Sequence, residues 1–160
     1  MMLVDRHRFC QYEKLAKAYL MLAGELLRDL HLWFLCEVPV GELLHVIHML
    51  EISLGYYISG SASLASQSAD ALGIFTGVLC CAECDSVEHR DRVCGSLLHT
   101  DPNLFSRLLR LTLDVVLSRK CPSSKAEVLL RSLIALDGES FRRLAGEFAE
   151  IACRPARMRR

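Results

Sequence analysis

Cysteines and histidines cluster between residues 80 and 99, where their types and spacing could bind a metal ion or provide a nucleophile. Cys81 and Cys84 are two residues apart, a spacing typical of zinc ligands. The candidate ligand set is Cys80, Cys81, Cys84, His89, Cys94 and His99. A single Cys-x-x-Cys pair is a weak signal, and its first cysteine continues an apolar helical pattern. The sequence therefore favours buried free thiols and leaves a zinc site as the alternative.

A thiol nucleophile activated by a histidine would be the other possible chemistry. The histidines considered for it are His45, His48, His89 and His99. No flank typical of a catalytic cysteine occurs, and no glycine-rich loop ends in Lys-Ser or Lys-Thr. Glu147 and Glu150 are expected on a solvated helix surface. We therefore expect no enzymatic activity, no cofactor and no catalytic residue.

Hydrophobic residues recur at helical spacing along most of the chain, and no convincing strand pattern occurs. The expected helices span residues 6–30, 39–57, 61–83, 102–119, 122–137 and 138–152. Between Cys84 and Thr100 a charged cluster weakens the pattern, which leaves either a short connecting helix or an ordered loop. The sequence therefore predicts an all-α fold.

Residues that start and stop helices divide the second half of the chain most clearly. Asp101 is expected to cap the helix that follows it. Cys121-Pro122 ends that helix, because a proline disfavours the α region in the residue before it. Ser124 and Glu127 have the spacing of a capping box, and Asp137-Gly138 separates the last two helices.

The expected helices have similar lengths and short connections, which is typical of stacked helical hairpins. We pair helix 6–30 with 39–57, helix 61–83 with 102–119, and helix 122–137 with 138–152. The prediction is an α-α superhelix of six to seven helices, built from hairpins of the HEAT type. It covers residues 1–153 and leaves residues 154–160 as a basic tail.

Composition excludes several classes of protein. The chain has 160 residues, of which 52% are hydrophobic and 24% charged, with a formal net charge of zero. This balance argues against a disordered chain and against a nucleic-acid-binding protein, which gains affinity from a basic surface. The longest apolar run, 71–82, is too short to span a bilayer, and no secretory signal is evident. We expect a soluble intracellular protein whose eight cysteines are reduced.

Several segments resemble the C-terminal HEAT repeats of the exportins, most closely the branch of exportin-4 and exportin-7. The similar segments are Phe9-Cys10-Gln11-Tyr12-Glu13-Lys14-Leu15, Pro39-Val40-Gly41-Glu42-Leu43-Leu44, Leu50-Glu51-Ile52-Ser53-Leu54-Gly55 and Asp101 to Leu117. The pair Ala135-Leu136 leading to Phe141 is also similar. The resemblance covers residues 7 to 150 and rests on the order and spacing of these segments.

The resemblance implies a protein-binding module of a longer nuclear transport receptor that shuttles between nucleus and cytoplasm. Its implied partners are a cargo protein, nucleoporins, and the GTPase Ran, which would bind mainly through N-terminal repeats outside this chain. It implies binding of neither nucleic acid nor membrane. The alternative function is that of an unrelated α-helical scaffold or adaptor with no role in transport.

A polar stripe on the expected helix 102–119 is the candidate partner-binding site. Arg107, Arg110 and Asp114 recur at helical spacing, with Ser118 one turn further on. Second helices of HEAT hairpins line the concave surface, so this stripe could meet an acidic partner, as could Glu42 and His45. The alternative interpretation is a plain solvated helix face.

Overall fold

The structure of the chain is a computed structural model that describes residues 12–29, 37–55, 62–80, 87–118 and 123–157. Within these ranges it is entirely helical apart from short connections, which confirms the all-α prediction. The seven helices are α2 (Glu13–Asp29), α4 (Val40–Gly55), α5 (Ala62–Cys80), α6 (Val87–Thr100), α7 (Leu104–Leu117), α8 (Ser123–Leu136) and α9 (Gly138–Arg157). The segment between Cys84 and Thr100, which the sequence left open, contains the helix α6.

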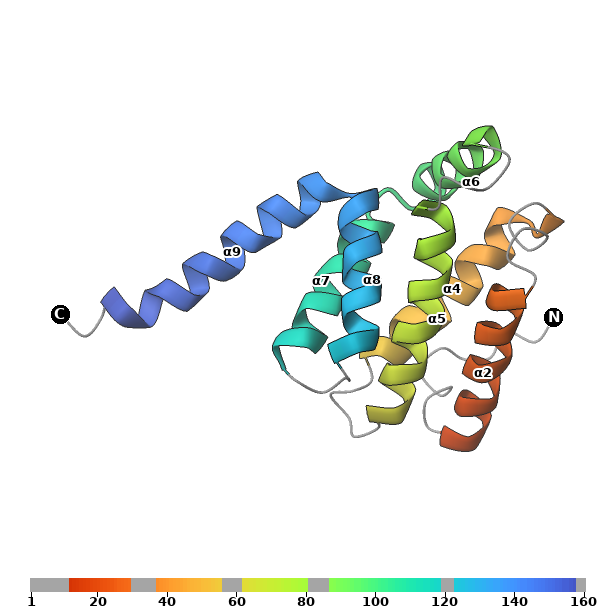
Figure 1. The fold of residues 1–160 in the computed structure, drawn as a ribbon, viewed down its shortest axis with the longest axis horizontal. Coiled ribbons are helices and arrows are strands. Elements are labelled where there is room, and N and C mark those ends of the chain that lie inside the picture. Colours follow the sequence, from red (N-terminus) through yellow and green to blue (C-terminus); the bar gives the residue numbers. More distant parts are fainter. Residues whose placement is uncertain (1–11, 30–36, 56–61, 81–86, 119–122, 158–160) are drawn as a thin grey trace.

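The helices form two rows (Figure 1). In one row α5 lies between α2 and α8, and in the other α4 lies beside α7. The rows meet where α4 packs on α5 and α7 packs on α8. The short helix α6 lies across one end of the bundle, and α9 extends away from it while contacting α7 and α8. This two-row packing fits an α-α superhelix.

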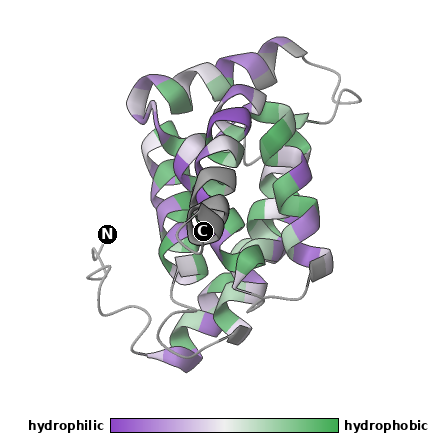
Figure 2. Ribbon diagram, turned by 90° about the vertical axis from the view of Figure 1, so that its left-hand side faces the viewer, coloured by the Kyte–Doolittle hydropathy of each residue, from purple (hydrophilic) through white to green (hydrophobic). Residues whose placement is uncertain are grey.

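The central position of α5 follows from its sequence. Leu64, Ala65, Leu72 and Phe75 are at most 1% exposed, because α2, α4 and α8 surround this helix. Small residues among the large ones let three neighbours approach. Hydrophobic stretches also run along the other helices of both rows (Figure 2). The core is therefore one continuous cluster that includes side chains from each helix of the two rows.

Packing of the consecutive helices corrects the expected hairpin partners. Among helices that follow one another in the described chain, the extensive contacts join α4 to α5 and α7 to α8. The helix α2 packs chiefly on α5. The expected pairs are 6–30 with 39–57 and 61–83 with 102–119, which correspond to α2 with α4 and α5 with α7. In the structure α4 pairs with α5 and α7 with α8 instead. The difference arises because periodicity shows which face of a helix is apolar but not which neighbour covers that face.

Three expected helix boundaries also differ from the structure. The residue at the N-cap position of α7 is Asn103, whose side chain makes no capping hydrogen bond, rather than Asp101. α8 begins at Ser123, so Ser124 is inside the helix, and the Glu127 carboxylate binds Arg131 at 2.6 Å instead of closing a capping box. The helix α9 continues to Arg157, so most of the expected basic tail belongs to it; residues 158–160 lie outside the described part.

Asp137 is the expected break between α8 and α9, and its contacts show how one residue serves both helices. Its backbone N–H donates to the Leu133 carbonyl at 2.9 Å, which closes α8. Its side-chain Oδ1 accepts the Ser140 backbone N–H at 3.0 Å, which caps the start of α9. No helix in the described ranges is both long and apolar enough to cross a membrane.

Candidate interaction surface

Arg107, the first residue of the expected polar stripe, is held within the protein. Its Nε donates to Glu51 Oε1 at 2.8 Å and its Nη2 to Glu51 Oε2 at 3.1 Å. Its Nη1 and Nη2 also donate to the two oxygens of Asp101, each at 2.8 Å. The guanidinium thus makes paired hydrogen bonds to two carboxylates at once, a geometry that lysine cannot supply.

His48 completes this cluster, which we call the Arg107 network (His48, Glu51, Asp101 and Arg107). The His48 Nε2 lies 3.1 Å from Asp101 Oδ2 and 3.4 Å from Arg107 Nη2. His48 and Glu51 are three residues apart on α4, so both face α7. Asp101 lies in the connection between α6 and α7. The network therefore joins α4, α7 and the end of α6.

The charges in the Arg107 network stabilise one another. The hydrogen bond from Arg107 is the main cause that lowers the pKa of Asp101 to about 2, and His48 and the Asn103 backbone N–H act in the same direction. Hydrogen bonds to Glu51 and then Asp101 raise the pKa of Arg107. The Glu51 and Asp101 side chains are only 18% and 17% exposed, so solvent screens them incompletely. The network is suited to bracing helices, and most donors of Arg107 are already used.

The other four expected partner-binding residues do not join Arg107 in one site. Arg110 Nη2 lies 3.3 Å from Glu147 Oε2 on α9, and Asp114 is exposed further along α7. Glu42 is exposed in the first turn of α4 and His45 is half-buried one turn later. Among the ion pairs that the structure describes around Arg107, none includes Glu42 or His45. The prediction that these five residues bind a partner stays a prediction.

The residues of the expected zinc set are only partly described. Cys80 Sγ donates to the Ser132 carbonyl at 3.3 Å, and Cys94 packs against the core. Cys81 and Cys84 lie outside the described residues, so the zinc alternative stays a prediction. Within the described part of the chain, no three His, Cys, Asp or Glu side chains are close enough to hold a metal ion.

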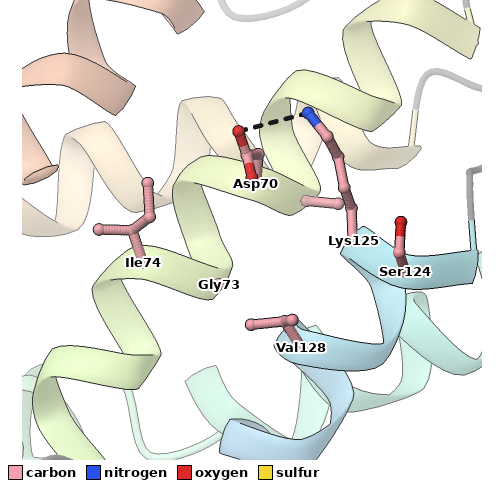
Figure 3. Close-up of a pocket in the computed structure, with 7 residues that line it drawn as sticks. Asp70, Gly73, Ile74, Ser124, Lys125 and Val128 are labelled. Atoms are coloured by element: carbon pink, nitrogen blue, oxygen red, sulfur yellow. Dashed lines mark ion pairs between the residues drawn. The ribbon is translucent and has the colours of Figure 1, made fainter.

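An apolar hollow lies between α5 and α8 on the described surface (Figure 3). We call it the α5–α8 groove. Its volume is about 310 Å³, and its lining residues are Ala69, Asp70, Gly73, Ile74, Ser124, Lys125 and Val128. Gly73 has no side chain to fill the space between Ile74 and Val128, so the floor of the groove is open and apolar.

Charged side chains bridge the two helices at one end of the α5–α8 groove. Lys125 Nζ lies 3.3 Å from Asp70 Oδ2, the ion pair drawn in Figure 3. Arg28 of α2 approaches the same carboxylate oxygen at 3.8 Å. All three side chains are more than a third exposed. A ligand in the groove would therefore meet an apolar floor beside two cations that share one carboxylate.

Sequence reasoning missed both the groove and the full Arg107 network. Glu51 and Arg107 are 56 residues apart, so their pairing depends on how α4 and α7 pack. For the groove a local signal existed: Gly73 and Gly77 are four residues apart on one helix and weaken its apolar pattern.

Comparisons of the chain with models of known protein families, with curated proteins and with solved structures gave no match. The resemblance to exportins accordingly stays a prediction from the sequence.

Proposed function

We propose that this protein is a helical protein-binding module whose α5–α8 groove receives apolar side chains of a partner protein. The observation that carries the proposal is the hollow of about 310 Å³ with an apolar floor, open to solvent between two neighbouring helices of one row. Grooves between packed helices are common sites for the apolar side chains of a docking helix.

The chemistry around the groove supports a protein partner over a small polar substrate. Val128 is 57% exposed on the rim although it is apolar, and Ile74 is half-buried beside it. Two cations, Lys125 and Arg28, lie beside two carboxylates, Asp70 and the Glu25 that binds Arg28. These charges balance, so the apolar floor is the feature that a partner would recognise. Burial of a few such side chains would supply most of the affinity, as in other interfaces.

The exportin resemblance extends this proposal to nucleocytoplasmic transport. In that case the partner is a cargo protein, and the module belongs to a receptor that Ran in its GTP form regulates. This extension is supported only by the order and spacing of the segments similar to exportins. An adaptor without a role in transport would use the same groove but would not depend on Ran.

A cross-linking experiment tests the groove. A photoreactive phenylalanine analogue is placed at Val128 and, as a control, at Leu117, which is equally exposed at 62% but lies on α7. We expect a defined partner to be cross-linked from position 128 and not from position 117. Val128→Glu should weaken capture of that partner about tenfold, because a carboxylate would enter an apolar floor. Equal cross-linking from both positions would reject the groove.

The transport role has its own readout. Capture of the same partner is compared in the presence of purified Ran loaded with GTP or with GDP, using the longest available form of the protein. A nucleotide-dependent change in capture supports an exportin-like receptor. Capture that is independent of the nucleotide supports the adaptor.

A further inference from the structure

The outward surface of α2 is unusually apolar. Within the described residues, seven large hydrophobic side chains are conspicuously exposed, and four of these lie on α2 or immediately before it. They are Tyr12, Leu15, Met21 and Leu22, which are 57–64% exposed. α2 ends one row of the bundle and has α5 on only one side (Figure 1). This helix therefore has an apolar face that the described part of the chain leaves uncovered.

Helical geometry places Leu15, Met21 and Leu22 on the side of α2 that faces away from the core. Ala16, Leu20, Ala23 and Leu27 are the buried residues of α2 and mark its inward side. At about 100° per residue, Ala18 lies almost directly opposite them, and Leu15, Met21 and Leu22 surround it. Each of these four residues is exposed. Together with Lys14 and Glu25, they form what we call the α2 outer face.

Two opposite charges, Lys14 and Glu25, lie at equal distances on either side of the apolar centre of the α2 outer face. Lys14, Ala18, Met21 and Glu25 follow one another at spacings of four, three and four residues, so they form a single row along the helix. The row begins with a positive charge and ends with a negative charge about 16 Å further on, at 1.5 Å per residue. Its midpoint lies between Ala18 and Met21.

We propose that the α2 outer face binds the same face of a second copy of this chain, with the two α2 helices antiparallel. A two-fold axis through the midpoint of the row places Lys14 opposite Glu25 of the second copy, and repeats the pair by symmetry. It also places the small Ala18 opposite the large Met21 of the second copy, twice. Such self-complementarity is what a two-fold interface requires, because the same surface must match itself.

One existing contact must be shared in this arrangement. Glu25 already binds Arg28 at 2.7 Å within α2. That pair is solvent-exposed and three residues apart, a class that stabilises a helix only slightly, so the Glu25 carboxylate is able to accept a second cation. Because one helix pair is a small interface, we expect a weak dimer with a Kd of about 0.1 mM.

Sedimentation equilibrium of the full chain between about 10 µM and 1 mM tests the proposal, since this range brackets the expected Kd. We expect a concentration-dependent dimer for the wild-type chain. Met21→Glu should abolish it, because two carboxylates would then lie in the apolar centre of the interface. Leu117→Glu, a substitution on α7 at an equally exposed position, is the matched control and should leave the dimer unchanged. Circular dichroism verifies that both variants remain helical.

Charge exchange gives a second, independent test. Lys14→Glu alone and Glu25→Lys alone should each weaken the dimer about fivefold, because each replaces two attractive pairs with two repulsive ones. The double variant Lys14→Glu/Glu25→Lys restores opposite charges and should return to within about twofold of the wild-type Kd. A chain that stays monomeric at 1 mM, or a dimer unaffected by Met21→Glu, would overturn the proposal. Failure of the partner-binding groove would not, because the Val128 and Met21 variants report on separate surfaces.

Discussion

Two junctions between helices, one within each row, are held by different physical means. Small residues and buried hydroxyls join α5 to α8. The Thr76 and Ser132 hydroxyls are 2.6 Å apart, and a Cβ added at Gly73 would be in ordinary van der Waals contact with the Leu129 nitrogen, at 3.6 Å. At the α4–α7 junction, buried leucines lie beneath the Arg107 network at the surface.

Because one junction is buried and the other carries surface charges, we expect the two junctions to respond to different perturbations. Burial makes the α5–α8 junction sensitive to side-chain volume and insensitive to salt or pH. The charges of the α4–α7 junction make it sensitive to protonation and ionic strength. Because the α5–α8 junction also forms the proposed binding groove, a partner would dock on the junction that depends more on side-chain volume.

The largest effect is expected from Leu129→Ala at the α5–α8 junction. Leu129 is completely buried, so the substitution leaves a cavity and should lower the free energy of unfolding by about 2 to 5 kcal/mol. Urea denaturation measures the change. Val128→Ala is the matched control one residue away, and its exposed side chain should cost less than about 0.5 kcal/mol. Equal losses for the two variants would contradict the assigned core.

Arg107→Ala should be the next most damaging substitution and should break the α4–α7 junction. It leaves Glu51 and Asp101 without their main cation, and we expect a loss of about 1 to 2 kcal/mol near pH 7, allowing for the half-exposed arginine. Arg131→Ala is the control, because it removes only an exposed pair with Glu127 within α8. That control should change stability by less than about 0.5 kcal/mol.

The loss caused by Arg107→Ala should depend on pH in a defined direction. The pKa of Asp101 is lowered in the folded chain from 3.8 to about 2. Its stabilisation is therefore complete above the unfolded pKa and is lost as the pH falls through about 2. The difference in unfolding free energy between the wild-type chain and Arg107→Ala should shrink between pH 5 and pH 2. A difference that stayed constant over this range would show that Asp101 does not depend on Arg107.

A smaller effect is expected at the hydroxyl pair between α5 and α8. Thr76→Val and Ser132→Ala should each cost about 1 kcal/mol, because each removes a buried hydrogen bond. The double variant should cost less than the sum of the two, because the hydrogen bond between the two hydroxyls can be lost only once. Thermal or urea unfolding of the four chains measures the coupling. Strict additivity would mean that the 2.6 Å contact contributes nothing.

These two junctions also show how far the sequence alone could be read. The recurrence of Leu104, Leu108 and Val115 predicted the helix at 102–119, and the structure has it at Leu104–Leu117. The same periodicity placed Arg107 away from the buried leucines, where it is exposed. It could not identify Glu51 as its partner, because that pairing joins residues far apart in the chain. The residue type of Asp101 predicts a local capping role, and its carboxylate does accept the Asn103 backbone N–H, but it also binds Arg107 and His48, which sequence cannot show.

The smallest predicted effects come from the glycines of α5, and they are stabilising. Gly77→Ala should raise the free energy of unfolding by about 0.5 to 1 kcal/mol, because nothing lies within 4 Å of the added Cβ and alanine favours a helix interior. Gly73→Ala should gain less, since its Cβ would lie 3.6 Å from both the Leu129 nitrogen and the Val128 Cγ1. Urea denaturation of both variants measures the difference.

Comparing the two glycine variants separates packing from function at position 73. An added Cβ at Gly73 makes only ordinary contacts, so close packing of α5 on α8 does not by itself require glycine there. Gly73 lies in the floor of the α5–α8 groove, and a methyl group would occupy part of that floor. If Gly73→Ala stabilises the chain while weakening capture of the partner cross-linked at Val128, the glycine serves the groove. If it destabilises the chain by more than 1 kcal/mol, the glycine serves the junction.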